Sequence, residues 1–277
     1  MIFLFFLLLS LGCLAGILAG LLGIGGGLVI VPAMSWFLIQ QGFTVDLAIS
    51  IAVASSLASM VLTSASAVVF HARRQVIAKE VIVRLAPALA VGAVFGAGLA
   101  IWLSGEQLAL VFAAIVGLIG VRMLLAIEPD TKHQSKRQSP FPRLWWLFGP
   151  LNGTVSAMIG IGGGSFNVPY LRWNGYPMVN AVAMASTCGW LIGLGGALTF
   201  MLITPELPPL SSNSPDQLAD LYRGLIGHVH WPAALLIGLA GAASAPLGVA
   251  LGHRLPAHIL SRIFGVFLIL VAFRMAL

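Results

Sequence analysis

Charged side chains are scarce in this sequence, and long stretches contain none. Only 8% of the 277 residues are charged and 59% are hydrophobic, whereas an ordinary soluble domain has about 25% charged residues. No Asp, Glu, Lys, Arg or His occurs in residues 1–45 or 47–70, and each stretch exceeds the roughly 20 apolar residues that a membrane-spanning helix needs. The scarcity of charge excludes a water-soluble fold. It predicts an all-α polytopic membrane protein whose main partner is the lipid bilayer.

Cysteines and nucleotide-binding signatures are also scarce. Cys13 and Cys188 lie in apolar stretches and have neither a disulfide framework nor a metal-binding spacing. The glycine-rich segments lack a preceding β-strand and a Walker lysine, so they do not predict a nucleotide site. The net charge of +6 is not carried by any soluble module, so it does not indicate binding to nucleic acid. We therefore expect no metal, no cofactor and no nucleic-acid partner.

The basic residues are concentrated between apolar runs. They cluster in residues 71–84 and 129–143, as is typical of cytoplasmic loops under the positive-inside rule. The N-terminus lacks the positive n-region of an export signal, so we expect the first helix to be retained. This pattern predicts a multi-pass protein of the bacterial inner membrane.

The chain contains an internal duplication. Gly-Ile-Gly-Gly-Gly occurs at residues 23–27 and again at 160–164, and each copy is followed at the same spacing by a proline, Pro32 or Pro169. Three further blocks recur in the same order. We predict a single membrane domain, 1–277, made of repeat 1 (1–126), a cytoplasmic linker (127–143) and repeat 2 (144–277). A Pro- and Ser-rich, mildly acidic insertion at 204–227 is predicted to be a periplasmic loop.

The duplicated glycine runs predict broken helices. The stretch 144–171 is uncharged, and it is long for one span but too short for two. Because each Gly destabilises a helix by roughly 0.5 to 1 kcal/mol relative to Ala, we expect two half-helices that meet at residues 160–164. If each break is a re-entrant hairpin, every repeat has three further transmembrane helices. An odd number of crossings would make the repeats inverted, as in many transporters.

The breaks are also the best candidates for a substrate site. Irregular backbone is tolerated inside a membrane only where protein or a cavity satisfies it, and a half-helix that starts at a break directs free N–H groups and its positive dipole end towards an oxyanion. The predicted substrate-binding residues are Gly25, Gly26, Gly27, Ser55, Ser56, Gly162, Gly163, Gly164, Asn167, Ser186 and Thr187.

Alternatives exist for several of these residues. The hydroxyls of Ser55, Ser56, Ser186 and Thr187 could instead bond within their own helices. Asn152 is a further possible donor beside the second break, whereas the positions that match Asn152 and Asn167 in the first repeat are apolar, so the site could be asymmetric. Glycines outside the motif are predicted to permit close helix packing. These are Gly92, Gly96, Gly98, Gly117 and Gly120.

The doubled motif resembles the TauE/SafE family of membrane permeases, also called the sulfite exporter family. The resemblance is carried by Gly-Ile-Gly-Gly-Gly with its proline in both halves, by the segments 54–56 and 185–187, and by His71 before two arginines. It covers about residues 14–274. It implies a secondary transporter for a small anion, such as a sulfur oxyanion or an organosulfonate.

Two other functions remain open at this point. An anion channel would use the same breaks, and saturation of flux would distinguish the two. An intramembrane enzyme needs at least a nucleophile and a base, but the six histidines all fall at span ends or in loops. We therefore expect no catalytic residues. The oligomeric state is left undetermined.

Overall fold

The computed structural model describes residues 2–22, 25–72, 79–125, 144–207, 221–252 and 257–276. The predicted linker 127–143 and most of the predicted insertion lie outside the described residues. So do Gly23 and Ile24 of the first glycine run, and residues 73–78 of the first basic cluster.

Helices form almost all of the described chain. The first half contains α1 (Ile2–Leu22), α2 (Gly27–Gln40), α3 (Val45–Ala72), α4 (Lys79–Trp102) and α5 (Gly105–Leu124). The second half contains α6 (Trp145–Met158), α7 (Gly164–Trp173), α8 (Met178–Leu202), α10 (Trp231–Gly252) and α11 (Ala257–Ala276). A short antiparallel hairpin of β1 (Leu225–Ile226) and β2 (Val229–His230) precedes α10.

Five described helices are long and apolar enough to cross a membrane. They lie within α3, α4, α5, α8 and α10. The prediction of an all-α polytopic membrane protein is therefore confirmed. α3 and α8 form the centre of the bundle, because 67% of the most apolar window of each is buried, against 39% for α4 and α5.

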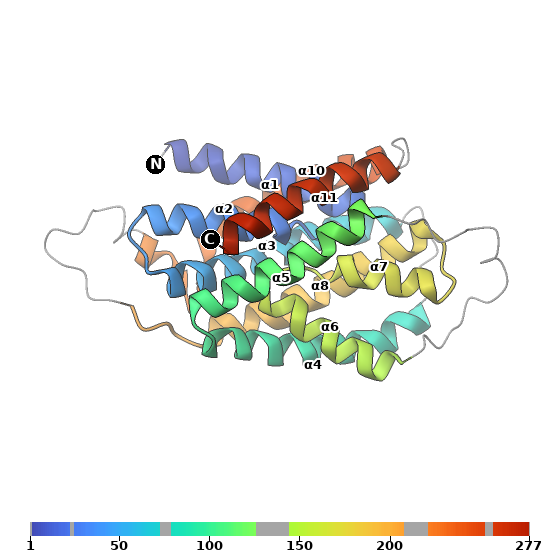
Figure 1. Ribbon diagram of the computed structural model, residues 1–277, viewed down its shortest axis with the longest axis horizontal. Helices are drawn as coiled ribbons and strands as arrows, with labels where there is room; N and C mark the ends of the chain where they lie inside the picture. The colour runs from blue at the N-terminus through green and yellow to red at the C-terminus, as the bar shows by residue number, and fades with distance from the viewer. Residues whose placement is uncertain are drawn as a thin grey trace, which may run out of the picture.

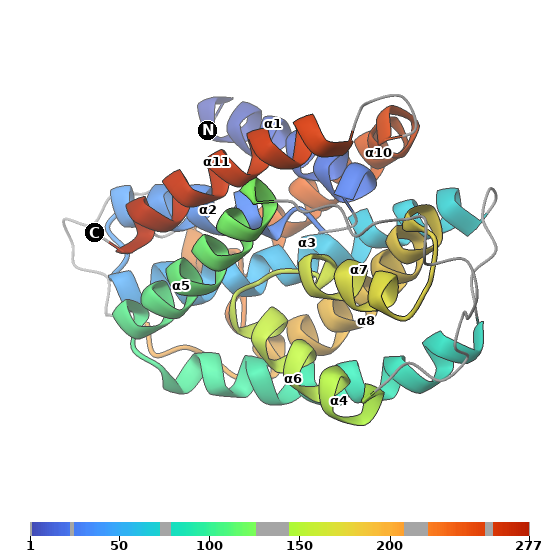
Figure 2. The same cartoon turned by 45° about the vertical axis from the view of Figure 1, so that its right-hand side comes forward.

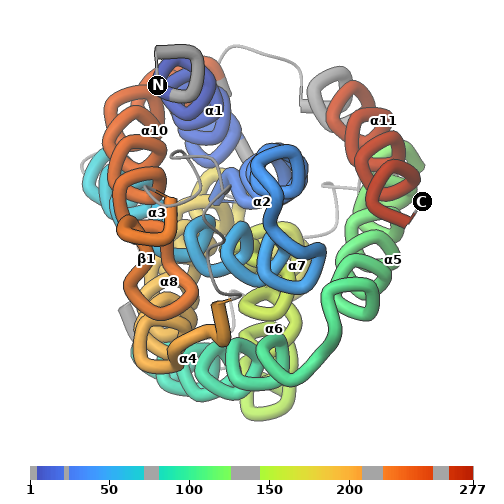
Figure 3. Tube along the Cα trace, turned by 90° about the vertical axis from the view of Figure 1, so that its left-hand side faces the viewer, coloured from blue at the N-terminus to red at the C-terminus, as the bar shows by residue number. Residues whose placement is uncertain are grey.

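The helices pack in pairs that join the two halves of the chain. α1 lies along α10, α4 along α6, and α5 along α11, while α3 packs on α8 (Figure 1). After a rotation of 45°, α5 and α11 still lie side by side (Figure 2). Viewed end-on, the short helices α2 and α7 lie inside a ring formed by the other helices (Figure 3). The chain therefore encloses the segments that follow its two glycine runs.

Small residues bring the paired helices close together. A Cβ built on Gly16 of α1 would overlap the backbone of Gly241 in α10, and one on Gly92 of α4 would overlap the carbonyl of Pro150 in α6. The predicted packing role is confirmed for Gly92. It is wrong for Gly98, because a Cβ at that position would meet nothing within 4 Å. Close approach of backbones maximises van der Waals contact, which matters where lipid removes the hydrophobic driving force.

The hairpin before α10 was not predicted from the sequence, which indicated only a loop. Its tip packs on the end of α8, where the His228 N–H donates to the Phe200 carbonyl over 2.9 Å. Its second strand lies on α3, where the His230 N–H donates to Ser55 Oγ, also over 2.9 Å. The hairpin therefore covers one end of the interface between α3, α8 and α10.

Charged side chains in the described part of the chain lie near helix ends. Arg122 and Arg172 occupy the last turns of α5 and α7, which both end at the right of Figure 1. Asp46 and Glu106 lie in the first turns of α3 and α5, which begin at the left. Arg274, in the last turn of α11, also lies on the left. The bundle centre is left to apolar and neutral polar groups.

Candidate functional site

Both glycine runs interrupt helices where the sequence predicts. α1 ends at Leu22 and α2 begins at Gly27, with Gly25 and Gly26 at φ of 81° and 77°. In the second half α6 ends at Met158 and α7 begins at Gly164, and here Gly160 and Gly163 have φ of 69° and 66°. These left-handed conformations are strained for other residues. Each motif therefore contains the glycines that its turn requires.

The two breaks touch each other. Gly27, the first residue of α2, packs so closely on the carbonyl oxygen of Gly160 that a Cβ would overlap it. A Cβ on Gly25 would lie 3.3 Å from the Cα of Gly162. Ser56 of α3 donates a hydrogen bond of 2.9 Å to the same Gly160 oxygen. The two glycine runs, one from each half of the chain, therefore meet at one buried position in the fold.

Both helices that start at the breaks lack a side-chain cap. The N-cap residues are Gly26 for α2 and Gly163 for α7, and neither helix has a capping side-chain hydrogen bond. In α2 the N–H groups of Val29 and Ile30 donate to the Gly26 carbonyl. In α7 those of Phe166 and Asn167 donate to the Gly163 carbonyl. The first N–H groups of each helix, with the positive dipole end, are suited to an anion.

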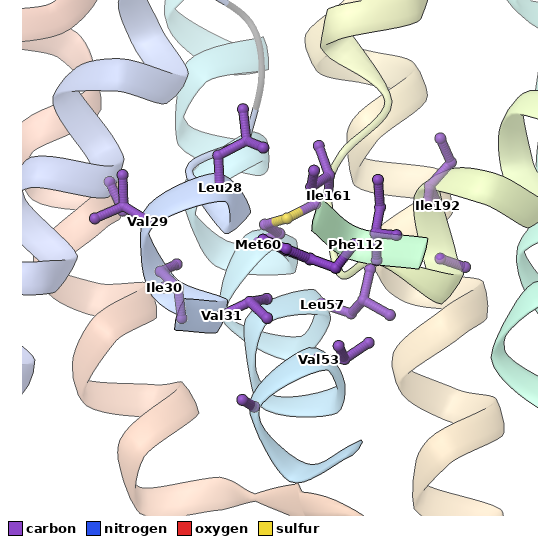
Figure 4. Close-up of a cluster of buried hydrophobic side chains, with 14 of the residues drawn as sticks. Leu28, Val29, Ile30, Val31, Val53, Leu57, Met60, Phe112, Ile161 and Ile192 are labelled. Atoms are coloured by element: carbon purple, nitrogen blue, oxygen red, sulfur yellow. The ribbon is translucent and has the colours of Figure 1, made fainter. Parts of the chain in front are cut away.

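Apolar side chains surround the contact. Figure 4 shows Met60 of α3 beside Leu28 of α2 and Ile161 of the second break, with Phe112 of α5 adjoining. The Met60 methyl group is 3.1 Å from the Cβ position of Gly25. Leu28, Met60, Ile161 and Phe112 are fully buried. Low polarity around a site strengthens every hydrogen bond made within it.

The predicted hydroxyl residues separate into two groups. Ser56 bridges α3 to the second break, and Ser55 accepts from the hairpin, so neither of these contacts lies within its own helix. Ser186 and Thr187 instead bond the carbonyls of Val182 and Ala183 one turn earlier in α8. The two halves therefore use their corresponding hydroxyl segments differently.

A buried polar network flanks the second break. Ser156 Oγ donates to Asn152 Oδ1 over 2.9 Å, and Asn152 Nδ2 donates to Asn167 Oδ1 over 2.8 Å. Asn152 and Ser156 lie one helical turn apart on α6, so they share one face of the helix. Sequence reasoning selected Asn167 but missed Ser156 and Met60. The i, i+4 spacing of Asn152 and Ser156 was the available signal for Ser156, whereas nothing in the sequence distinguishes Met60.

The side chains that contact the glycines of the breaks in the described part of the chain are neutral, as Ser56, Met60 and Asn167 are. The described residues contain no group of three or more His, Cys, Asp or Glu that could hold a metal ion. Two buried histidines lie outside the membrane-spanning segments, in the hairpin. Burial lowers the pKa of His228, and it lowers the pKa of His230 to about 4, so both imidazoles are neutral at pH 7.

These features define a class of protein: a multi-pass helical membrane protein with two helix breaks that meet inside the bundle. The profile of the family described as "Sulfite exporter TauE/SafE" matches residues 8–275. The chain belongs to that family.

Relatives match over nearly their full lengths. A probable membrane transporter protein of Haemophilus influenzae is 34% identical over 275 residues, which cover 98% of this chain and 97% of the relative. A protein of the same description from Methanocaldococcus jannaschii is 26% identical over 94% of this chain and 92% of its own length. One from Xylella fastidiosa is 27% identical over 94% and 90%. No solved structure gives a significant match.

Proposed function

We propose that this protein is a secondary transporter for a small anion and that the substrate binds where the two glycine breaks meet. The observation that carries the proposal is the contact of Gly27 with Gly160, which brings two uncapped helix N-termini into one buried region. Family membership and the names of the relatives, which are probable membrane transporters, support it.

The substrate that best suits this environment is a singly charged oxyanion. Neutral N–H and O–H donors surround the breaks, and the described charged groups lie towards helix ends, so helix dipoles would supply most of the balancing field. The cost of burying an ion rises steeply with its charge. A sulfur oxyanion in its monoanionic form, or an organosulfonate, meets this requirement, and the family description names sulfite.

The same proposal includes an inverted duplication. In Figure 1 α1, α3 and α5 run from left to right, whereas α6, α8 and α11 run from right to left, and both termini lie at the left. The pairing of α1 with α10 is matched by that of α6 with α4. α2 and α7 have only 14 and 10 residues, about 21 and 15 Å, which suits re-entrant segments.

Alternating access would then involve the contact between the breaks. Gly25, Gly27, Gly162 and Gly164 are buried, so the substrate must enter by separation of the two breaks from one side at a time. The tight α1–α10 and α4–α6 pairs connect the repeats, and the whole of one repeat cannot move without carrying a helix of the other. We therefore place the moving contact at the breaks.

Transport in proteoliposomes tests the proposal. The purified protein should take up sulfite or methanesulfonate with a rate that saturates, and preloaded unlabelled anion should accelerate uptake by exchange. Flux that rises linearly with concentration and shows no exchange would identify an anion channel instead. Absence of flux for both anions, in vesicles where the protein is correctly inserted, would refute an anion transporter of this specificity.

A further inference from the structure

The second glycine break contains donors that the protein itself does not use. Asn167 Nδ2 is buried and has no hydrogen-bond partner among the described residues, and the same is true of Ser165 Oγ. The Asn167 side chain is fully buried. A buried polar group without a partner costs about 1 to 3 kcal/mol, so native proteins rarely keep one without a reason.

The polar network engages one end of the Asn167 amide, the carbonyl oxygen Oδ1. This oxygen accepts from Asn152 Nδ2, and Asn152 Oδ1 is in turn occupied by the Ser156 hydroxyl. Because Oδ1 is engaged in this way, Nδ2 is the free end of the amide. Nδ2 is 3.1 Å from the position of a Cβ on Gly163, the N-cap of α7.

Side chains on a helix lean towards its N-terminus, so Asn167, in the first turn of α7, projects back to the break. Its free amide and the uncapped N–H groups of α7 converge on the same place. Two independent features, a helix N-terminus and an unpartnered buried donor, therefore indicate the same ligand chemistry.

Among its described residues, the first break has no such unpartnered side-chain donors. When Gly23 is aligned with Gly160, the positions that match Asn152, Ser156, Ser165 and Asn167 are occupied by Ala15, Ala19, Leu28 and Ile30. At the equivalent N-cap, Gly26, the built Cβ meets the methyl group and backbone of Ala15 rather than polar side-chain atoms. Duplication has therefore left one polar break facing one apolar break.

We propose that the anionic head of the substrate binds at the second break only, where Asn167 Nδ2, Ser165 Oγ and the first N–H groups of α7 hold its oxygens. The first break, with Leu28 and Met60, faces the remainder of the substrate. The site therefore takes a singly charged oxyanion in one orientation, with its least polar side towards α2. This inference rests on the proposed function and specifies its binding site.

Binding of methanesulfonate to the purified protein in nanodiscs, measured by calorimetry, tests the assignment. Asn167→Asp has the same shape and keeps Oδ1 as the acceptor for Asn152, but it replaces the free donor by a negative charge. We expect the Kd to rise at least tenfold. The matched control is Ile30→Val at the equivalent position of the first break, which should leave the Kd within about twofold.

Failure of the inference and failure of the proposed function give different results. If the unsubstituted protein transports the anion and Asn167→Asp binds it as tightly, the second break is not the oxyanion site. If Asn167→Asp does not fold, Ser165→Ala decides: a Kd raised severalfold supports the assignment and an unchanged Kd overturns it. If the unsubstituted protein neither binds nor transports any tested oxyanion, the proposed function itself fails and the inference with it.

Discussion

Gly27 and Gly160, which belong to different halves of the chain, are in direct backbone contact at the centre of the bundle. The first residue of α2 packs on a carbonyl oxygen of the second break, and no side chain fits between them. Ser56 bonds the same oxygen from α3. Because the contact is this close, a substitution in one break should displace the backbone of the other.

Gly27→Ala should separate the breaks. The new Cβ would overlap the Gly160 carbonyl, and overpacking of this kind costs about 1 to 3 kcal/mol. We expect at least a tenfold loss of anion uptake in proteoliposomes and a lower unfolding temperature. The control is Gly98→Ala in α4, where the Cβ meets nothing within 4 Å. It should leave uptake unchanged and stability equal or slightly higher; equal uptake by the two variants would contradict the prediction.

Ser56→Ala should destabilise the contact without adding bulk. The substitution removes the donor to the Gly160 oxygen and leaves that buried carbonyl less satisfied, at a cost of about 1 to 3 kcal/mol. Thermal unfolding of the purified protein measures the effect. Ser10→Ala provides the comparison, because the Ser10 hydroxyl is exposed and bonds only within α1. The prediction is wrong if the two variants lose the same stability.

Acid should weaken the hairpin. Burial lowers the pKa of His230 to about 4 from an ordinary value of 6.5, so the folded state favours the neutral ring. The free energy of folding that depends on neutral His230 is fully present above about pH 6.5. It is lost as pH falls towards 4, at up to about 1.4 kcal/mol per pH unit. We expect the unfolding temperature to fall over this range.

His230→Asn isolates that contribution. His230 Nδ1 accepts the Ala233 N–H at the start of α10, and Asn can cap a helix in the same way without titrating. The variant should lose less stability than the unsubstituted protein between pH 6.5 and 4. The loss that persists is expected from His228, because burial lowers the pKa of that residue too. Identical pH profiles for the variant and the unsubstituted protein would exclude His230 as the cause.

The two ends of the bundle should face opposite sides of the membrane. In a background with Cys13 and Cys188 replaced by Ala, Thr204→Cys, at an exposed position after α8, should react with an impermeant maleimide on intact cells. Ser135→Cys, in the basic linker, should react only after permeabilisation, because positive loops remain cytoplasmic. Strong labelling of Ser135→Cys on intact cells would refute this topology.

Much of the fold could be predicted because its determinants are local. Uncharged runs specify membrane helices, and the glycine motifs specify their own interruptions, so α6 and α7 separate at residues 160–164 as the composition indicates. The pairing of the halves depends instead on which small residues meet across helices, as Gly16 and Gly241 do. Spacing within one helix does not carry that information. The hairpin was missed because its two-residue strands are too short for a periodic pattern.

The site was predictable in its backbone and less so in its side chains. The glycines of both motifs come together, and Ser56 reaches the second break, but Ser186 and Thr187 bond within α8. Sequence alone could not decide between these outcomes, because a hydroxyl on a helix can bond its own backbone or a neighbour. Met60 at the contact is indistinguishable in sequence from the other apolar residues of α3.

The location of a bound anion tests the central claim most directly. A structure with 2-bromoethanesulfonate, using the bromine to locate the ligand, should show the sulfonate oxygens about 3 Å from the N–H groups at the start of α7. The bromine should point towards α2 and Met60. A ligand bound only at the helix ends or on the protein surface, in a protein shown to transport it, would contradict the claim that the two glycine breaks form the substrate site.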